Sequence, residues 1–461
     1  MTSRSNSAQR DIETLLHPYT NLAAHRETGP MVLERGQGVM VWDNKGTPYI
    51  EAMSGLWCTS LGYGNRELVE AASEQLGKLA FTHLFGGKSH DPAIELAEKL
   101  KSLMPMPVSK IFFTNSGSEA NDTQIKLQWY YNNAIGRPEK KKIISRQKAY
   151  HGVTVASASL TGLPIVQNDF DLPIAGILHT DCPHHYRFAE AGESELEFSA
   201  RLAANLERMI LEEGPETVAA FIAEPVMGAG GVLVPPQGYF AAIEAVCRKY
   251  DVTMISDEVI CGFGRTGKWF GCQSTDFRPD SISFAKALTS GYIPMGGLTV
   301  SEDMYQAMLD QSRKLGAFGH GYTYTGHPVA AVTALKTIEI YERDDIPGRA
   351  AALAPLFLKR LTALGEHPLV GEARGLGLVG GLELVADKES RRSFDPAHAV
   401  GASAARATER HGVIVRAIGD TIAICPPLII SEEEIGALFD AVERGLDDEL
   451  GRVTREGLAR P

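Results

Sequence analysis

A lysine at the end of an apolar, strand-like run could act as a nucleophile. Lys286 closely follows Ser281–Phe284, which has the composition of a short buried β-strand. Because desolvating an ammonium group is costly, burial would lower the pKa of this amine and make it reactive enough for Schiff-base chemistry. The same sequence would also fit a lysine at a strand end whose side chain extends its charged group into solvent. Lys286 alone leaves both interpretations open.

An aspartate ends another buried-looking run. Asp257 follows Thr253–Ser256, and open α/β sheets bind ligands beyond the carboxyl ends of their strands. A carboxylate there could keep a pyridine nitrogen protonated, so that the ring accepts electrons. Aspartate is also a common helix N-cap, and the residue alone does not separate the two roles.

The segment Thr114–Glu119 runs from a strand into a Gly-Ser turn and then a helix. Hydroxyls and backbone N–H groups at a helix N-terminus can bind a phosphate. The same residues fit a capping box from Ser116 to Glu119. Both interpretations can hold, because a cap and an anion site use the same unpaired donors.

These residues must be positioned by an α/β fold. Strand-like and helix-like segments alternate through the middle of the chain, which predicts a mostly parallel sheet flanked by helices. The predicted strands are Ile111–Thr114, Lys142–Ser145, Ala219–Ala223, Thr253–Ser256 and Ser281–Phe284, and two of the predicted helices are Ser118–Tyr131 and Tyr239–Tyr250.

The two ends of the chain have a different pattern. The C-terminal part predicts a smaller α+β domain: a helix after His327-Pro328, strands at Gly375–Leu384, Val413–Arg416 and Thr421–Ile424, and helices at Ala402–His411 and from Ser431. The first part shows short strands, Met40–Trp42 and Pro48–Ile50, and is too short to fold alone. We therefore predict an N-terminal segment, residues 1–60, that packs with the small domain, a large domain, 61–328, and a C-terminal small domain, 329–461.

Composition excludes several classes of protein. The net charge of −12 argues against a nucleic-acid binder, which needs a basic face. The sequence contains no run of about 18 apolar residues, so no membrane span is predicted. The six cysteines form no CxxC pair, and the N-terminal residues have no apolar signal core, so we expect a reduced, cytoplasmic protein. We predict no metal site, because the adjacent His184 and His185 cannot easily face one ion.

Two glycine patterns imitate a dinucleotide-binding motif. Gly262–Gly267 and Gly375–Gly380 both fit G-x-G-x-x-G. A dinucleotide site needs a strand before the glycines and a helix directly after them. The residues after both patterns are not helix-like, which disfavours a nicotinamide-dependent dehydrogenase.

In this order and spacing, several blocks make the chain resemble the class III, or ω-amino acid:pyruvate, aminotransferases of pyridoxal-phosphate (PLP) fold type I. The blocks are Gly55–Cys58, Thr114–Asp122, Tyr150–Gly152, Glu224–Val226 with Gly228–Gly231, Asp257–Gly267, Lys286, and Gly321–Thr323 with Gly326–Pro328. The resemblance runs from His17-Pro18 to the last helix.

The resemblance implies a role for each cofactor-contacting residue. Lys286 would form the Schiff base and carry the proton, and Asp257 would pair with the pyridine nitrogen. Tyr150 and Val259 would pack on the two faces of the ring, and Glu224 would lie near its phenolic oxygen. Ser116, Gly117 and Ser118 would hold the phosphate, with Thr323 reaching it from the neighbouring subunit of a homodimer, which could assemble further into a tetramer.

The resemblance also implies a substrate pocket. Its lining would be Tyr19, Leu56, Trp57, Phe85, Tyr150, Val153, Ala229 and Ile260, mostly bulky and apolar, which suits amines without a carboxylate at the reacting carbon. Arg416 would grip the carboxylate of a keto acid. Gly86-Gly87-Lys88 departs from the pattern at the pocket entrance, and ornithine and γ-aminobutyrate are substrates of relatives with this fold.

The implied activity is transfer of an amino group from a primary amine or ω-amino acid to a keto acid such as pyruvate, by a ping-pong mechanism. A PLP-dependent aminomutase or decarboxylase on the same fold is the alternative. A dehydrogenase would depend on the two glycine patterns alone. A non-catalytic binding protein would not need both Lys286 and Asp257.

Overall fold

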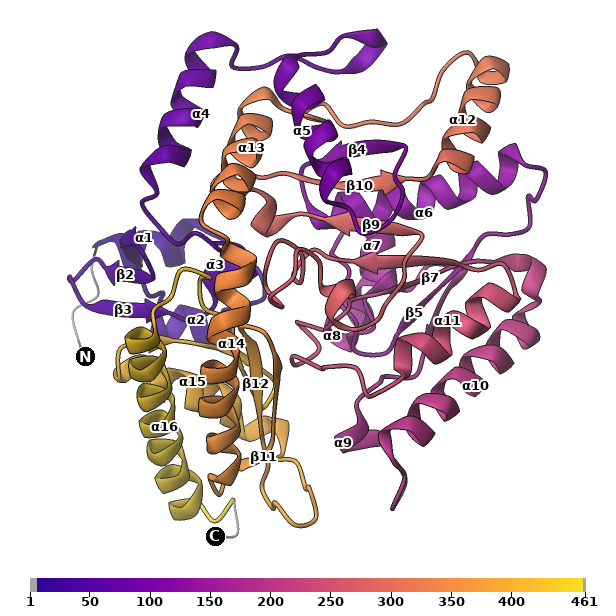
Figure 1. Ribbon diagram of the computed structural model, residues 1–461. Helices are drawn as coiled ribbons and strands as arrows, with labels where there is room; N and C mark the ends of the chain where they lie inside the picture. Colours follow the sequence, from indigo (N-terminus) through magenta and orange to yellow (C-terminus); the bar gives the residue numbers. More distant parts are fainter. Residues whose placement is uncertain (1–5, 459–461) are drawn as a thin grey trace.

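The largest sheet of the protein has seven strands, of which β4, β10, β9, β7 and β5 are labelled in Figure 1. The computed structural model describes residues 6–458, and the strand order is β4-β10-β9-β8-β7-β5-β6. β10 runs in the direction opposite to the other six strands, so it pairs antiparallel with both of its neighbours, β4 and β9. The strands are β4 Lys110–Thr114, β5 Lys142–Arg146, β6 Ile177–Thr180, β7 Val218–Ala223, β8 Thr253–Asp257, β9 Ser281–Phe284 and β10 Gly296–Val300. The predicted mostly parallel sheet is confirmed; β6 and β10 were not predicted.

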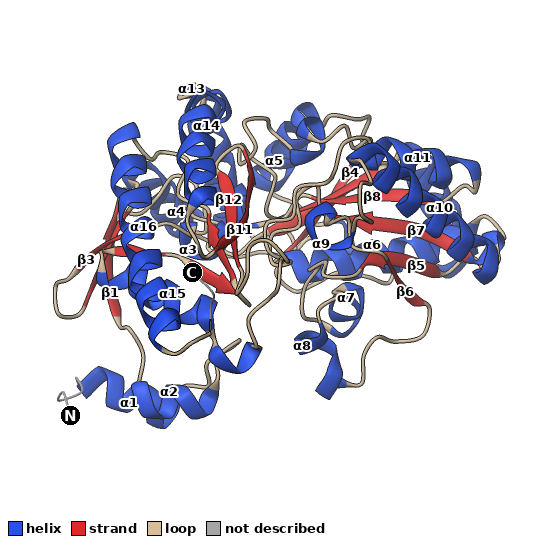
Figure 2. Cartoon of the chain, turned by 90° about the horizontal axis from the view of Figure 1, so that it is seen from below, coloured by secondary structure: helices blue, strands red, loops and turns tan. Residues whose placement is uncertain are grey.

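Helices cover both faces of this sheet. Figure 2 shows α6 and α7 on one face and α10 and α11 on the other. Every residue of β7, β9 and β10 is consequently buried, as expected when both faces of a parallel sheet are covered. The helices are α6 Gly117–Ala134, α7 Val155–Leu160, α10 Glu195–Glu213 and α11 Tyr239–Lys249, with shorter helices α8 Pro164–Gln167 and α9 His185–Phe188.

The N-terminal strands form a second sheet together with a strand from the far end of the chain. The order is β1-β2-β3-β13, and Val413 and Ile414 pair in parallel with Ile50 and Glu51. The elements are α1 Asn6–Thr14, α2 Leu22–Thr28, β1 Leu33–Gln37, β2 Met40–Asp43, β3 Pro48–Glu51, α3 Ser54–Trp57 and β13 Val413–Ile414. This pairing joins the first and last parts of the chain.

A third, antiparallel sheet has the order β11-β12-β15-β14 and packs against α14 and α15, and α16 packs on these two helices. The predicted strand Val413–Arg416 is divided, because β13 pairs with β3 while β14 pairs with β15. The elements are α14 Ile346–Ala363, β11 Val370–Leu376, β12 Val379–Leu384, α15 Val400–Arg410, β14 Arg416–Ile418, β15 Thr421–Ile424 and α16 Glu432–Arg455.

One helix of the predicted C-terminal domain packs elsewhere. α13 (Pro328–Arg343) lies against α4 (Arg66–Lys78) and α5 (Asp91–Leu103), beside the large sheet rather than the small one. α12 (Glu302–Leu315) packs on α6. The predicted domain limits therefore stay a prediction, with α13 as the element that links the two parts.

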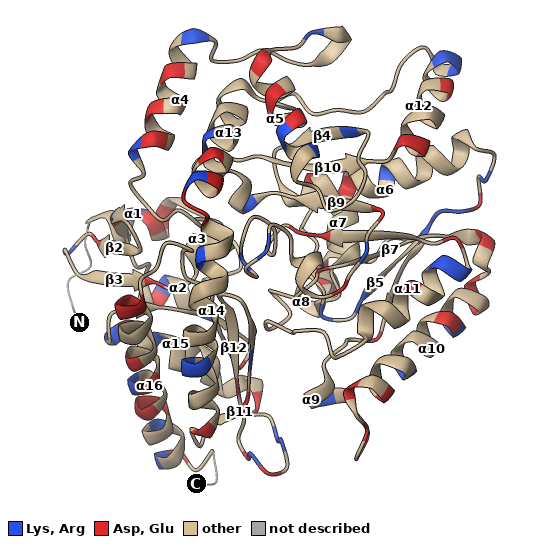
Figure 3. Cartoon of the chain, viewed as in Figure 1, with Lys and Arg blue, Asp and Glu red and all other residues tan. Residues whose placement is uncertain are grey.

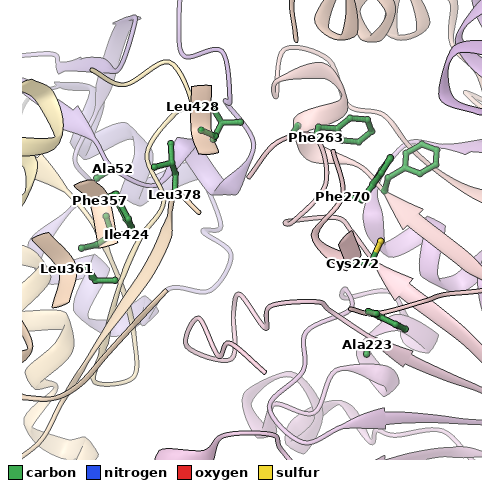
Figure 4. Close-up of a cluster of buried hydrophobic side chains, with 14 of the residues drawn as sticks. Ala52, Ala223, Phe263, Phe270, Cys272, Phe357, Leu361, Leu378, Ile424 and Leu428 are labelled. Carbon is green, nitrogen blue, oxygen red and sulfur yellow. The ribbon is translucent and has the colours of Figure 1, made fainter. Parts of the chain in front are cut away.

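A continuous apolar core connects the sheets. Figure 4 shows Phe357, Leu361 and Ile424 from the small sheet and its helices, and Phe263 and Phe270 from the segment after β8, all members of one buried cluster. Outer helices such as α10 and α16 instead carry both acidic and basic residues, with acidic residues in the majority (Figure 3). Within residues 6–458, none of the helices has both the length and the apolar character that a membrane crossing requires.

A buried arginine crosslinks the three sheets. Arg265 is 2% exposed and follows β8. It donates hydrogen bonds to the carbonyl oxygens of Leu378 (3.1 Å) and Pro426 (2.6 Å) and to Ser54 Oγ (3.1 Å). Its guanidinium therefore reaches the turn between β11 and β12, the segment after β15 and the short helix α3.

We predict that Arg265→Met lowers the free energy of unfolding by about 3 kcal/mol, because it leaves buried acceptors without donors. Urea unfolding of the holoenzyme measures this change. The matched control is Arg278→Met, whose side chain is 77% exposed and pairs with Glu244; we expect a loss below about 1 kcal/mol. Equal losses in the two variants would contradict the crosslinking role.

Candidate active site

A cavity of about 360 Å³ lies where β8 and β9 end and α6 begins. Ligands of open α/β sheets bind at this edge. Most of the predicted site residues lie on its wall: Tyr19, Leu56, Trp57, Ser116, Gly117, Ser118, Tyr150, Glu224, Ala229, Asp257, Val259, Ile260, Lys286 and Arg416.

Three predicted residues lie outside the cavity wall of the single chain. Val153 is 55% exposed and Phe85 is 49% exposed, and Thr323 is exposed as well. Phe85 packs against the loop that carries Thr323: a Cβ on Gly321 would lie 2.9 Å from the Phe85 ring. Phe85 and the Thr323 loop therefore share one exposed surface.

Three donors hold the carboxylate of Asp257, which is buried at the end of β8. Its Oδ1 accepts from the N–H of Val259 (3.0 Å). Its Oδ2 accepts from Asn121 Nδ2 (2.7 Å) and from His151 Nδ1 (2.8 Å). His151 and Asn121 were not predicted as site residues, although both lie within quoted motif blocks. Asn121 follows Gly117 by one helical turn, which places both on one face of α6.

Lys286 follows β9 in a left-handed backbone conformation, with φ of 47°. Burial lowers the pKa of its ammonium group, and the negative charge of Asp257 opposes that shift. Tyr19 (φ 49°) and Trp57 (φ 66°), which also line the cavity, share the left-handed conformation. Such backbone costs about 1–3 kcal/mol per residue and concentrates at ligand sites.

The N-terminus of α6 supplies the polar end of the cavity. Ser116 is the N-cap, and its Oγ accepts from the N–H of Glu119 (3.2 Å). The Glu119 carboxylate in turn accepts from the N–H of Asn115 (2.7 Å). One half of the predicted capping box, the bond to Ser116, is therefore present, while Glu119 accepts from Asn115 instead of from the N–H of Ser116. The first-turn N–H groups of Gly117 and Ser118 belong to the set that a helix leaves unpaired and that an anion can bind.

Glu224 connects the cavity wall to the loop of Gly228. Its Oε1 accepts from the N–H of Tyr150 (3.0 Å) and its Oε2 from the N–H of Gly228 (3.0 Å). Burial raises the pKa of Glu224. Burial also raises the pKa of the Tyr150 phenol, whose ring meets that of Tyr19 edge to face at 6.5 Å.

A buried glutamate shapes the turn that carries Leu56 and Trp57. Glu51 accepts hydrogen bonds from the N–H groups of Met53 (3.2 Å) and Gly55 (2.5 Å). Burial raises the pKa of Glu51 to about 7. This turn buries Trp57 and leaves Leu56 54% exposed at the cavity rim. No motif in the sequence indicated Glu51.

Arg416 is the cation on the substrate side of the cavity. Burial lowers the pKa of its guanidinium, while Tyr150 and Tyr19 oppose that shift. Within residues 6–458 it forms no ion pair. Asp420, the nearby acid, accepts instead from the N–H of Gly401 (2.9 Å). The cavity therefore contains a partly buried positive charge beside apolar and aromatic walls.

The two glycine patterns do not form a dinucleotide site. Gly262–Gly267 leads into the short 3-10 helix Gly271–Ser274. Gly375–Gly380 lies in the hairpin of β11 and β12. Neither pattern opens an α-helix, as the sequence indicated.

A lysine and an aspartate at neighbouring strand ends, above a helix N-terminus, are the arrangement of a PLP-dependent enzyme on an α/β scaffold. The chain belongs to the class-III aminotransferase family, whose family model matches residues 22–446. It is therefore a PLP-dependent aminotransferase, as the sequence predicted.

Similar proteins are transaminases over nearly the whole chain. The chain is 50% identical to the chloroplastic γ-aminobutyrate transaminase 3 of Solanum lycopersicum, covering 95% of this chain and 85% of that protein. It is 48% identical to the mitochondrial γ-aminobutyrate transaminase 1 of Oryza sativa subsp. japonica, covering 92% and 82%. The ω-transaminase from Pseudomonas jessenii in complex with PMP, an amino form of PLP, is 52% identical, with a TM-score of 0.96 over 98% of this chain and 99% of that chain.

The donors and acceptors of the cavity fit PLP. Lys286 Nζ has no hydrogen-bond acceptor within residues 6–458, and His151 Nε2 and Asn121 Oδ1, next to Asp257, are buried without partners. An amine, a paired carboxylate and a helix N-terminus match the aldehyde, ring nitrogen and phosphate of this cofactor.

A substitution at Gly117 tests whether the close packing of α6 against Val259 is required for cofactor binding. A Cβ at position 117 would lie 2.9 Å from both Val259 methyl groups. We predict that Gly117→Ala weakens PLP binding about tenfold, because overpacking costs about 1–3 kcal/mol. Titration of the apoenzyme with PLP measures this. The control is Gly77→Ala on α4, where the added methyl meets nothing within 4 Å.

A double variant makes this prediction specific. If the clash is the cause, Gly117→Ala combined with Val259→Ala loses less affinity than the two single changes together. Strict additivity would show that the effect of Gly117→Ala arises elsewhere.

Proposed function

We propose that this aminotransferase moves an amino group from a primary amine or ω-amino acid, such as γ-aminobutyrate, to a keto acid such as pyruvate, in two half-reactions. The observation that carries the proposal is Arg416, a cation that forms no ion pair within residues 6–458 and lies beside the apolar walls of the cavity. The names of its relatives, γ-aminobutyrate transaminases and ω-transaminases, support the same substrate class.

When bound, PLP supplies an aldehyde that takes up the amino group and a ring that withdraws electrons. Lys286 would hold the cofactor covalently, and its amine would move the proton at the reacting carbon of the donor. Asp257 would keep the ring nitrogen protonated, since its carboxylate is a paired, buried anion. His151 and Asn121 would orient that carboxylate through the hydrogen bonds at 2.8 and 2.7 Å.

The remaining cofactor contacts follow the walls of the cavity. Ser116, Gly117 and Ser118 would hold the phosphate at the start of α6. Tyr150 and Val259 would pack against the two faces of the ring, and Glu224 would lie near its phenolic oxygen.

The substrate side combines one cation with apolar side chains. Leu56, Trp57, Ala229 and Ile260 would contact the alkyl or aryl part of the amine donor. Arg416 would bind the carboxylate of the keto acid, for which a planar guanidinium is suited. Tyr19 would close the pocket from the N-terminal segment.

A homodimer would complete the site. Phe85, Val153 and Thr323 lie outside the cavity of their own chain, and Phe85 shares an exposed surface with the Thr323 loop. We assign Phe85 and Thr323 to the cavity of a second copy, with Val153 at its rim and Gly86-Gly87-Lys88 at its entrance. The free cysteines of the structure agree with the cytoplasmic location that we propose.

Lys286 tests the covalent attachment. We predict that Lys286→Ala lowers turnover by several orders of magnitude, because the covalent link and the proton-transferring amine are both lost. Borohydride reduction of the wild type should leave the cofactor mass on the Lys286 peptide, and the exposed Lys268→Ala control should label equally. Cofactor mass on another lysine would refute the assignment.

Arg416 tests the substrate class. A hydrogen bond to a charged group contributes about 1.5–3 kcal/mol, so Arg416→Ala should slow the half-reaction with pyruvate by about one to two orders of magnitude. The half-reaction with an aryl or alkyl amine should change far less, because that donor has no carboxylate. Single-turnover rates with each substrate measure both effects.

The control is Arg410→Ala, which removes an exposed arginine paired with Asp448 and should change neither half-reaction. Equal losses in both half-reactions of Arg416→Ala, or none, would remove Arg416 from carboxylate binding. Release of a rearranged amine or of carbon dioxide, without transfer to pyruvate, would instead favour the aminomutase or decarboxylase alternative.

A further inference from the structure

Two histidines and an aspartate converge in the N-terminal segment, at a spacing that matches no metal motif. His17 Nε2 lies 2.9 Å from each carboxylate oxygen of Asp11, and His25 Nε2 lies 3.0 Å from Oδ1 of the same carboxylate. The two imidazole rings are tilted by 39° with centroids 4.3 Å apart. One ligand atom from each of the three side chains lies within 4.8 Å of the other two.

This cluster joins two helices that bury few of their side chains within the part of the chain that the structure describes. Asp11 lies on α1 and His25 on α2, and His17 lies in the loop between them. α1 buries only Ala8, and α2 buries none of its residues. The three cluster side chains are nevertheless shielded, with exposed fractions of 17%, 26% and 11% for Asp11, His17 and His25. Polar contacts rather than apolar packing therefore hold α1 to α2.

We propose, contrary to our expectation from the sequence, that Asp11, His17 and His25 form a metal site. The site would bind a divalent transition metal, with Zn²⁺ as the favoured ion, and the bound ion would hold α1 to α2. Two imidazoles and one carboxylate are a common ligand set for such ions, which accept water in the remaining position. Bonds of about 2.0–2.1 Å in a tetrahedron separate its ligand atoms by roughly 3.4 Å. The separations of 2.9 and 3.0 Å between the Asp11 carboxylate and the two imidazole nitrogens require only a few tenths of an ångström of expansion, and the ligand atoms of all three side chains lie within 4.8 Å of one another.

The chemistry of the site selects against other ions. Mg²⁺ and Ca²⁺ prefer ligand sets made only of oxygen atoms, and this cluster offers one carboxylate and two nitrogens. A second cluster, His184 with Glu372 and Glu383, is different because Arg374 pairs with both carboxylates at 2.6 and 2.7 Å. The guanidinium there already supplies the positive charge that a metal would bring.

The proposed metal site is adjacent to the active-site cavity. Tyr19 lies two residues after His17, lines the cavity and meets the ring of Tyr150 edge to face. Because only Pro18 separates the two residues, a shift of the loop at His17 would also move the Tyr19 ring. A bound ion would therefore restrict the segment that carries Tyr19, which is a property beyond the transfer reaction.

Calorimetric titration of the holoenzyme with Zn²⁺ alone tests the site. We expect one ion per chain, at least tenfold weaker binding in Asp11→Asn and in His25→Gln, and no saturable binding of Mg²⁺. The matched control is His411→Gln, which removes a histidine paired with a single carboxylate, Asp448, at 3.1 Å. This control should bind Zn²⁺ as the wild type does.

Hydrogen–deuterium exchange adds a structural measurement. Zn²⁺ should slow amide exchange in residues 6–28 of the wild type at least tenfold and leave it unchanged in His25→Gln. Absence of saturable Zn²⁺ binding, or wild-type binding by both ligand variants, would overturn the proposal and leave a hydrogen-bonded cluster only. Neither measurement uses turnover, so its outcome is independent of the proposed substrate class.

Discussion

The active site depends on keeping the negative charge of Asp257 buried and paired. An unpaired carboxylate in such a setting would neutralise itself by taking up a proton. Here three donors converge on it, from Val259 two residues later, from Asn121 on α6 and from His151 on the loop that carries Tyr150. The same three segments form the cavity wall. Pairing this one charge therefore fixes the helix N-terminus, the aromatic wall and the end of β8 relative to one another.

The sheet supplies the other half of that constraint. β8 and β9 are parallel neighbours, and Asp257 pairs in register with Ser283, three residues before Lys286. Parallel strands end at the same edge of a sheet, so the acid and the amine face the same cavity. The negative charge of Asp257 opposes the lowering of the Lys286 pKa that burial causes.

The substrate side is built from parts that lie far apart in the sequence. Tyr19 comes from the N-terminal segment, Leu56 and Trp57 from a turn held by Glu51, and Arg416 from the small sheet. Arg265 ties these parts together, because its bonds reach Ser54, Leu378 and Pro426. The left-handed backbone at Tyr19, Trp57 and Lys286 is a cost that this surrounding structure must offset. The cavity is accordingly a property of the assembled parts rather than of any one motif.

The sequence by itself determined the strands and the chemistry at their ends. Short β-branched runs bounded by turns predicted β4, β5, β7, β8 and β9, and the residue types after β8 and β9 indicated an amine and an acid for a pyridine cofactor. Such patterns are local, because they depend only on residues that are neighbours in the sequence. β10 escaped prediction because its Gly296-Gly297 start lacks the apolar run of a buried strand.

Only the tertiary structure decided which distant groups meet. Nothing near Asp257 in the sequence points to His151 or Asn121, and nothing near Trp57 points to Glu51, because these contacts form through sheet register and helix packing. The run Val413–Arg416 was divided between two sheets. Val413 pairs with Ile50 of β3, more than 350 residues away in the sequence, whereas Arg416 pairs with Ala423 of β15, a few residues away. Hydrogen bonds and ion pairs act over a few ångströms in space, whatever the separation along the chain, so a pattern confined to neighbouring residues cannot specify them.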